Sequence, residues 1–212
     1  MKKRICCFIL AFILIAICQT GCGKKDNGMK KVVLNEVAHS IFYAPQYVAI
    51  EMGYFKDAGI DLVLETGFGA DKTMTALISG NADIGFMGSE STIYAYAEGS
   101  KDYAVNFAGL TQRAGNFLVA REKIDNFSWD MVKGKNVLGG RKGGMPQMVL
   151  EYILKANNID PASDLSIDQS VDFGLTAGAF SGNTEYDFTV EFEPGATSLE
   201  KEGKGYVVAS LG

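Results

Sequence analysis

The body of this chain contains no cysteine. All four cysteines lie within the first 22 residues, at Cys6, Cys7, Cys18 and Cys22. Everything after that segment therefore lacks a disulfide, a thiol nucleophile and a cysteine-bound metal. Histidine is nearly as scarce, because His39 is the only one, and no Gly-x-Ser-x-Gly nucleophile motif occurs. The sequence therefore predicts no catalytic residue, no metal and no cofactor.

The chain also has little positive charge. Its formal net charge is −5, and three of its cations, Lys2, Lys3 and Arg4, stand at the very start. Without these three positive charges the formal charge of the remainder becomes −8. No basic stripe is left to neutralise a phosphate backbone, which argues against a nucleic-acid partner. An acidic body is also poorly suited to binding an anionic membrane by charge alone.

An apolar run follows those cations, over residues 5–18. At about 14 residues it is shorter than a membrane-spanning helix and matches the apolar segment of a secretory signal. Gly21 and Cys22 come next, and this ending resembles a bacterial lipoprotein signal, in which the cysteine becomes the lipid-bearing N-terminus. We therefore expect a signal peptide at residues 1–21, a lipid on Cys22, a flexible tether at residues 22–30, and an extracytoplasmic protein anchored to the cell membrane. The alternative is an uncleaved signal anchor.

The rest of the chain alternates between strand-like and helix-like patterns. In the first half, strands are expected at residues 31–35, 60–65, 83–87, 103–110 and 117–120. Helices are expected from about residue 44, over 71–79, and up to about residue 97. In the second half, strands are expected at 135–139, within 165–171, at 187–192 and at 206–211, with helices at 145–156, 175–180 and 194–202. This alternation predicts two α/β units, at residues 31–120 and 121–212, each a mostly parallel sheet flanked by helices.

Four segments are distinctive in combination: HSIFYAPQYVAIEMGYFKDAGID at residues 39–61, LISGNADIGFMGS at 77–89, VLGGRKGG at 137–144 and EFEP at 191–194. In this order they resemble the solute-binding proteins that serve nitrate, taurine, alkanesulfonates and pyrimidine precursors of thiamine. The resemblance implies a type II periplasmic-binding-protein-like fold, whose two lobes close on a ligand about a hinge. It also implies a monomer that captures a small molecule for the permease and ATPase of an ABC importer.

In this family the chain crosses back from the second lobe to complete the first. The sequence stops at Gly212, just after a predicted strand. We therefore expect a C-terminally truncated chain without the second crossing to lobe 1. Two alternative functions share the resemblance: a ligand sensor and a pyrimidine-synthesis enzyme. The related eukaryotic enzymes use a cysteine-rich metal motif, which the body of this chain lacks.

Ligands of open α/β sheets bind beyond the carboxyl ends of the strands. This rule selects three loops of the first unit, which hold His39, Phe42 and Tyr43, then Gly88, Ser89 and Ser91, and then Thr111 and Gln112. Aromatic rings can stack on a ligand, and free N–H groups at a helix start suit an anionic or polar group. The alternatives are a surface or packing role for the histidine, core packing for the rings and ordinary N-capping by the serines.

The second unit offers a glycine-rich helix start beside Arg141, at Gly143, Gly144 and Met145. This arrangement suits a small anion or a polar head group held by backbone N–H groups. The alternative is a solvated turn that the glycines merely permit.

Glu191 and Glu193 lie at the end of a predicted strand of the second unit. Two carboxylates favour an amine or amidine over an anion, and the pyrimidine-binding members of the family place an acidic residue near this point. The alternative for Glu193 is a favourable position at a helix start. Because the helix starts and Arg141 favour an anion instead, we expect a small organic nutrient, with a pyrimidine precursor and a sulfonate such as taurine both left open.

Overall fold

The computed structural model describes residues 28–172 and 174–212, and Lys31–Gly212 form a unit distinct from Met1–Lys30. The expected signal peptide at residues 1–21, the lipid on Cys22 and most of the tether at residues 22–30 lie outside the described residues. Within the described part of the chain, no helix is both long and apolar enough to cross a membrane.

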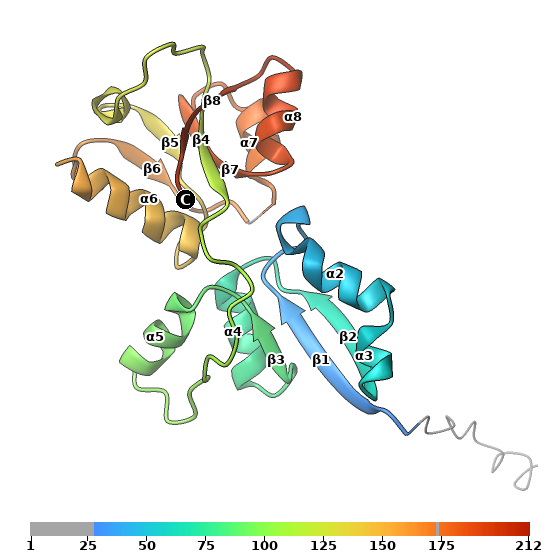
Figure 1. Ribbon diagram of the computed structural model, residues 1–212. Helices are drawn as coiled ribbons and strands as arrows, with labels where there is room; N and C mark the ends of the chain where they lie inside the picture. Colours follow the sequence, from blue (N-terminus) through green and yellow to red (C-terminus); the bar gives the residue numbers. More distant parts are fainter. Residues whose placement is uncertain (1–27, 173) are drawn as a thin grey trace, which may run out of the picture. The chain divides into compact units, whose positions relative to one another are not determined.

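The first part of the Lys31–Gly212 unit contains a three-stranded sheet (Figure 1). Its strands are β1 (Lys30–Glu36), β2 (Ile60–Thr66) and β3 (Ile84–Phe86), in the order β2-β1-β3. β1 and β3 run parallel, with Leu34 opposite Ile84. The connecting helices are η1 (Ile41–Tyr43), α2 (Ala44–Glu51), α3 (Tyr54–Asp57), α4 (Ala70–Ile78) and α5 (Glu90–Ala97). We call these elements the three-stranded part.

A five-stranded sheet follows, in the order β6-β5-β7-β4-β8 (Figure 1). Its strands are β4 (Asn116–Ala120), β5 (Asn136–Leu138), β6 (Ser166–Asp168), β7 (Phe188–Phe192) and β8 (Tyr206–Ser210). β5 is parallel to β6 and β7, whereas β4 is antiparallel to β7 and β8. With its helices, which are η2 (Trp129–Val132), α6 (Met145–Ala156), α7 (Thr176–Gly182) and α8 (Gly195–Lys201), it makes the five-stranded part.

Helices cover both faces of the five-stranded sheet (Figure 1). Successive residues of a strand point to opposite faces, and in β4 both faces are apolar. Leu118 packs in the cluster that contains Leu154 of α6. Val119 packs in a second cluster with Phe180 of α7 and Leu199 of α8. This arrangement of helices on strands that mostly share one direction confirms the predicted α/β fold class.

The strand predicted at residues 103–110 does not form. Val105 and Phe107 are 75% and 78% exposed, and the segment has no regular structure. A strand is stable only when its backbone groups pair with neighbouring strands, and no strand among the described residues pairs with this segment. The prediction is wrong here because an apolar run indicates strand propensity and says nothing of a partner.

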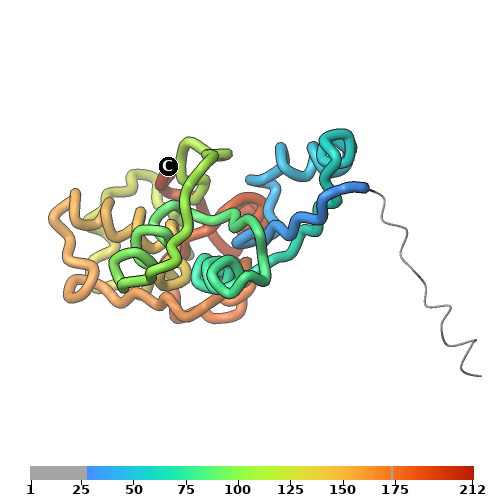
Figure 2. Tube along the Cα trace, turned by 90° about the horizontal axis from the view of Figure 1, so that it is seen from below, coloured from blue at the N-terminus to red at the C-terminus, as the bar shows by residue number. Residues whose placement is uncertain are grey.

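The strand predicted at residues 117–120 does form, as β4, but it lies in the five-stranded sheet and not with the first unit. Its partners are distant in sequence, since Leu118 pairs with Val190 of β7 and Ala209 of β8. The C-terminal end of the chain lies next to the start of β4, where the Leu211 N–H donates to the Asn116 carbonyl at 2.9 Å (Figures 1 and 2). These long-range pairings, and not the local pattern, decide which sheet the strand joins.

Candidate functional site

A cavity of about 300 Å³ is lined by residues of both parts. Val37 follows β1, Met87 follows β3 and Phe192 ends β7. Two helix starts also contribute, since Glu90 begins α5 and Met145 begins α6. The cavity therefore lies beyond the carboxyl ends of strands, which is where open α/β sheets bind their ligands.

Four aromatic rings line this cavity in a row: Phe86, Tyr43, Phe42 and Phe192. The ring centroids are 4.5 Å apart for Tyr43 and Phe86, 5.5 Å for Phe42 and Tyr43, and 5.9 Å for Phe42 and Phe192. These are ordinary separations for stabilising aromatic pairs. We call the space the aromatic cavity, because such a wall suits the flat or apolar part of an organic molecule.

Gly115 allows the chain to pass close to this wall. A Cβ at Gly115 would collide with the ring of Phe42. Residue 115 directly precedes β4, where the chain enters the five-stranded sheet. Glycine is needed here for space, since a backbone can approach a ring this closely only without a side chain.

A larger pocket of about 610 Å³ shares Arg141, Pro146 and Phe192 with the aromatic cavity. It is lined by three further predicted polar residues, which are His39, Glu191 and Glu193. The candidate residues thus fall into two adjoining groups, one mainly aromatic and one with carboxylates.

His39 is bound to a buried carboxylate. Its Nδ1 lies 2.9 Å from Oε1 of Glu36, which is fully buried. Glu36 also accepts hydrogen bonds from the Tyr47 hydroxyl at 2.8 Å, the Gln46 amide at 3.0 Å and the Thr66 hydroxyl at 3.3 Å. A buried carboxylate needs such donors. One nitrogen of His39 therefore has a structural partner, while the largely exposed side chain borders the larger pocket.

The two carboxylates near the end of β7 have different surroundings. Glu191 is 4% exposed and accepts a hydrogen bond from Thr189 Oγ1 at 2.9 Å. Burial raises the pKa of Glu191 to about 7. Glu193 instead accepts bonds from the N–H and Oγ1 of Thr197, at 3.1 and 2.9 Å, at the start of α8. Its carboxylate thus acts as a helix cap, which supports the alternative that the sequence left open.

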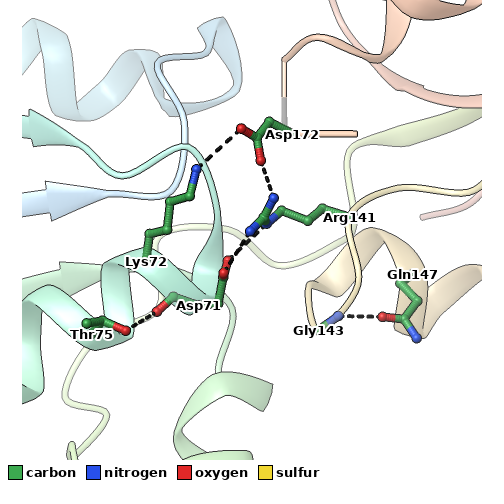
Figure 3. A network of polar contacts seen from close by, with 7 residues as sticks. All are labelled: Asp71, Lys72, Thr75, Arg141, Gly143, Gln147 and Asp172. Carbon is green, nitrogen blue, oxygen red and sulfur yellow. Dashed lines mark hydrogen bonds and ion pairs between the residues drawn. The ribbon is translucent and has the colours of Figure 1, made fainter. Parts of the chain in front are cut away.

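Arg141 joins the three-stranded part to the five-stranded part (Figure 3). Its Nε and Nη2 donate to the two carboxylate oxygens of Asp71 on α4, at 3.0 and 2.8 Å. Its Nη1 donates to Asp172, whose other oxygen accepts from Lys72 Nζ at 3.3 Å. The guanidinium beside Asp71 holds the pKa of that carboxyl below its usual range. Arg141 is therefore already paired with two carboxylates of the chain, which weakens its predicted role as a partner for an anionic ligand.

Replacing Arg141 with methionine should lower the free energy of unfolding by about 1 kcal/mol, because partly exposed ion pairs contribute little. The loss should shrink as salt is added, since salt screens exposed charges. Urea unfolding at low and high salt measures both effects. Lys142→Met is the matched control, because its side chain is exposed and its amine makes no hydrogen bond with any described residue. An equal loss in the two variants would contradict the pairing described for Arg141.

The structure brings most of the predicted site residues to one of the two spaces. The aromatic cavity is lined by Phe42, Tyr43, Gly88, Thr111, Gln112, Gly144 and Met145. The larger pocket is lined by His39, Glu191 and Glu193. Neither space is lined by Ser89, Ser91 or Gly143.

Several residues that line the aromatic cavity were not among the predicted site residues. These include Phe86, Glu90, Arg113, Lys142 and Phe192. Glu90 could have been found, because it stands one residue after Ser89 at the same strand end and helix start. Phe192 could not, because a hydrophobic residue at the end of a strand is expected in the core as often as in a cavity.

Comparison with known proteins gives the same fold and a family. The family model described as "NMT1/THI5 like" matches residues 41–190. Over 189 residues the chain is 51% identical to "Putative binding protein YtlA" of Bacillus subtilis (strain 168). That match covers 89% of this chain, and the chain spans 56% of the length of that protein.

Two solved structures share the architecture. The alkanesulfonate-binding protein SsuA from Xanthomonas axonopodis pv. citri has a TM-score of 0.67 at 16% identity, with 86% of this chain and 60% of that one covered. The periplasmic nitrate-binding protein NrtA from Synechocystis PCC 6803 has a TM-score of 0.58 at 19% identity, with 84% and 51% covered. The likeness confirms the type II periplasmic-binding-protein-like fold. Since the family model matches more than half of the sequence, the chain belongs to the NMT1/THI5-like family.

Proposed function

We propose that this protein captures a small organic molecule in the aromatic cavity and delivers it to an ABC importer. The observation that carries the proposal is the position of that cavity, which is walled by four rings and lies beyond the ends of strands from both sheets. A concave apolar space with a few polar groups is the usual form of a small-molecule site. Ligand binding without catalysis is the function that we propose for this cavity.

The comparisons support this role. The relative from Bacillus subtilis is named as a binding protein, and the two solved structures are an alkanesulfonate-binding protein and a periplasmic nitrate-binding protein. In this proposal the two lobes correspond to the two sheets, with β4 counted in the second lobe. The protein acts as a monomer, is anchored outside the cytoplasm by a lipid on Cys22, and passes its ligand to a permease that is driven by an ATPase.

A thermal-shift screen tests the proposal. The ligands are pyrimidines of the thiamine pathway, taurine, alkanesulfonates and nitrate. A ligand that binds only the folded state stabilises it, by about 2.7 kcal/mol at a hundredfold excess over the dissociation constant. We expect one class to raise the unfolding midpoint in a saturable way. A flat response to every class would contradict these choices of ligand.

Gly115→Ala tests whether the binding occurs in the aromatic cavity. The added methyl group displaces the Phe42 ring, so the affinity for the ligand found in the screen should fall at least tenfold, which is about 1.4 kcal/mol. Gly109→Ala is the matched control, because a Cβ there meets nothing within 4 Å. Titration calorimetry of both variants gives the comparison. Unchanged affinity in Gly115→Ala would place the ligand elsewhere.

A further inference from the structure

Glu90 is a buried carboxylate in the wall of the aromatic cavity. Its side chain belongs to a residue that is only 2% exposed, and it lines the cavity. No side chain among the described residues donates a hydrogen bond to either carboxylate oxygen, and only backbone N–H groups lie near them. An ionised group in this condition is costly unless something pairs with it.

The carboxylate lies between the starts of two helices. It covers Gly88, since a Cβ on that residue would collide with both of its oxygens. Burial raises the pKa of Glu90, and the backbone N–H groups of Glu90 and Met145 lower it in part. These N–H groups belong to the first residues of α5 and α6. Helix starts carry unpaired N–H groups and partial positive charge, and they attract anions.

We propose that Glu90 occupies the position between these helix starts that the anionic group of a ligand would otherwise take, and so makes the cavity selective for a flat molecule with a hydrogen-bond donor. This inference rests on the proposed function and specifies its ligand class. The donor group, such as an amidine or a ring-bound amine, pairs with the carboxylate of Glu90, which lines the cavity. The ring packs against Phe42 and Tyr43.

The charges around the cavity agree with this assignment. A sulfonate or nitrate placed between the two helix starts meets the carboxylate of Glu90, and like charges at short range repel strongly where water is excluded. The guanidinium of Arg141 does not offset this, because it binds Asp71 and Asp172. The other cations that line the cavity, Arg113 and Lys142, belong to exposed residues and are well solvated.

Three small aromatic probes of similar size test the proposal: benzamidine, 2-aminopyridine and benzenesulfonate. Their dissociation constants are measured by titration calorimetry with the full protein. We expect benzamidine and 2-aminopyridine to bind at least tenfold more tightly than benzenesulfonate. This comparison of the three probes uses the unmodified protein, so it remains valid even if a substitution impairs folding.

Substitutions at Glu90 give the second readout. Glu90→Gln keeps the shape and loses the charge, so benzamidine should bind at least tenfold more weakly. Glu90→Ala frees the helix starts, so benzenesulfonate should bind at least tenfold more tightly. Glu98→Ala, at the exposed other end of α5, is the control and should change neither affinity.

The outcomes separate this inference from the proposed function. If the unmodified protein prefers benzenesulfonate, or if the Glu90 variants leave the ratio of affinities unchanged, the role of Glu90 is overturned while ligand capture stands. If neither these probes nor the compounds of the thermal-shift screen bind, the proposed function fails, and the assigned ligand class fails with it.

Discussion

At pH 8, Glu191→Gln should be more stable than the unmodified protein by up to about 3 kcal/mol, and this difference should vanish near pH 4.5. The reason is burial, which raises the pKa of Glu191 from 4.5 to about 7 in the folded protein. One pKa unit corresponds to about 1.4 kcal/mol of differential interaction between the two protonation states. The buried side chain therefore prefers the neutral form, which glutamine resembles.

The direction in which the free energy of unfolding changes with pH follows from the protons that Glu191 binds in each state. Between pH 4.5 and about 7 the folded protein keeps a proton on Glu191 that the unfolded chain has released. The free energy of unfolding thus falls as pH rises through this window and is level on either side of it. Below the window both states are protonated, so the full stability is present there.

Urea unfolding at pH 5 and pH 8 measures this difference. Glu122→Gln is the matched control, because it makes the same chemical change at an exposed position. It should leave the stability within about 0.5 kcal/mol at both pH values. If Glu191→Gln were destabilising at pH 8, the buried charge would have to be well compensated, and the account of Glu191 would be wrong.

Phe180→Ala should lower the free energy of unfolding by about 3–5 kcal/mol, the usual range for removing a buried phenylalanine ring. Phe180 is fully buried between α7 and the five-stranded sheet, in the cluster with Val119 and Leu199. The Arg121 guanidinium also lies 3.6 Å from the centroid of its ring. Alanine would leave a cavity and remove this cation–π contact.

Phe107→Ala is the natural comparison, because that ring is 78% exposed. It should change stability by no more than about 0.5 kcal/mol. Chemical unfolding of the two variants under one condition gives both values. Similar losses in the two would mean that the five-stranded sheet is not the main core of the described chain.

Much of the fold could be predicted from local patterns. Nearly every predicted helix and strand is present within a few residues of its expected bounds, as with the helix at residues 145–156, which is α6. The predictions that failed concern which strands pair with one another. Residues 103–110 have an apolar pattern without a neighbouring strand, and β4 pairs with strands that lie about 70 to 90 residues later.

The candidate site was predictable only in outline. The strand-end rule located Phe42 and Tyr43, since it depends on chain order and topology, and the glycine-rich helix start located Met145. It could not foresee which charges the protein pairs internally. Arg141 is neutralised by contacts across about 70 and 30 residues of sequence, and the Glu90 carboxylate is left without a side-chain partner among the described residues. Such pairings depend on tertiary geometry that no local pattern encodes.

The most direct test of ligand capture is a crystal structure of the protein grown with the strongest ligand from the thermal-shift screen. The account predicts density for that ligand in the aromatic cavity, against the rings of Phe42 and Tyr43, with a donor group facing Glu90. A ligand bound only in the larger pocket beside His39 and Glu191, or outside both spaces, would contradict the claim that the aromatic cavity is the binding site.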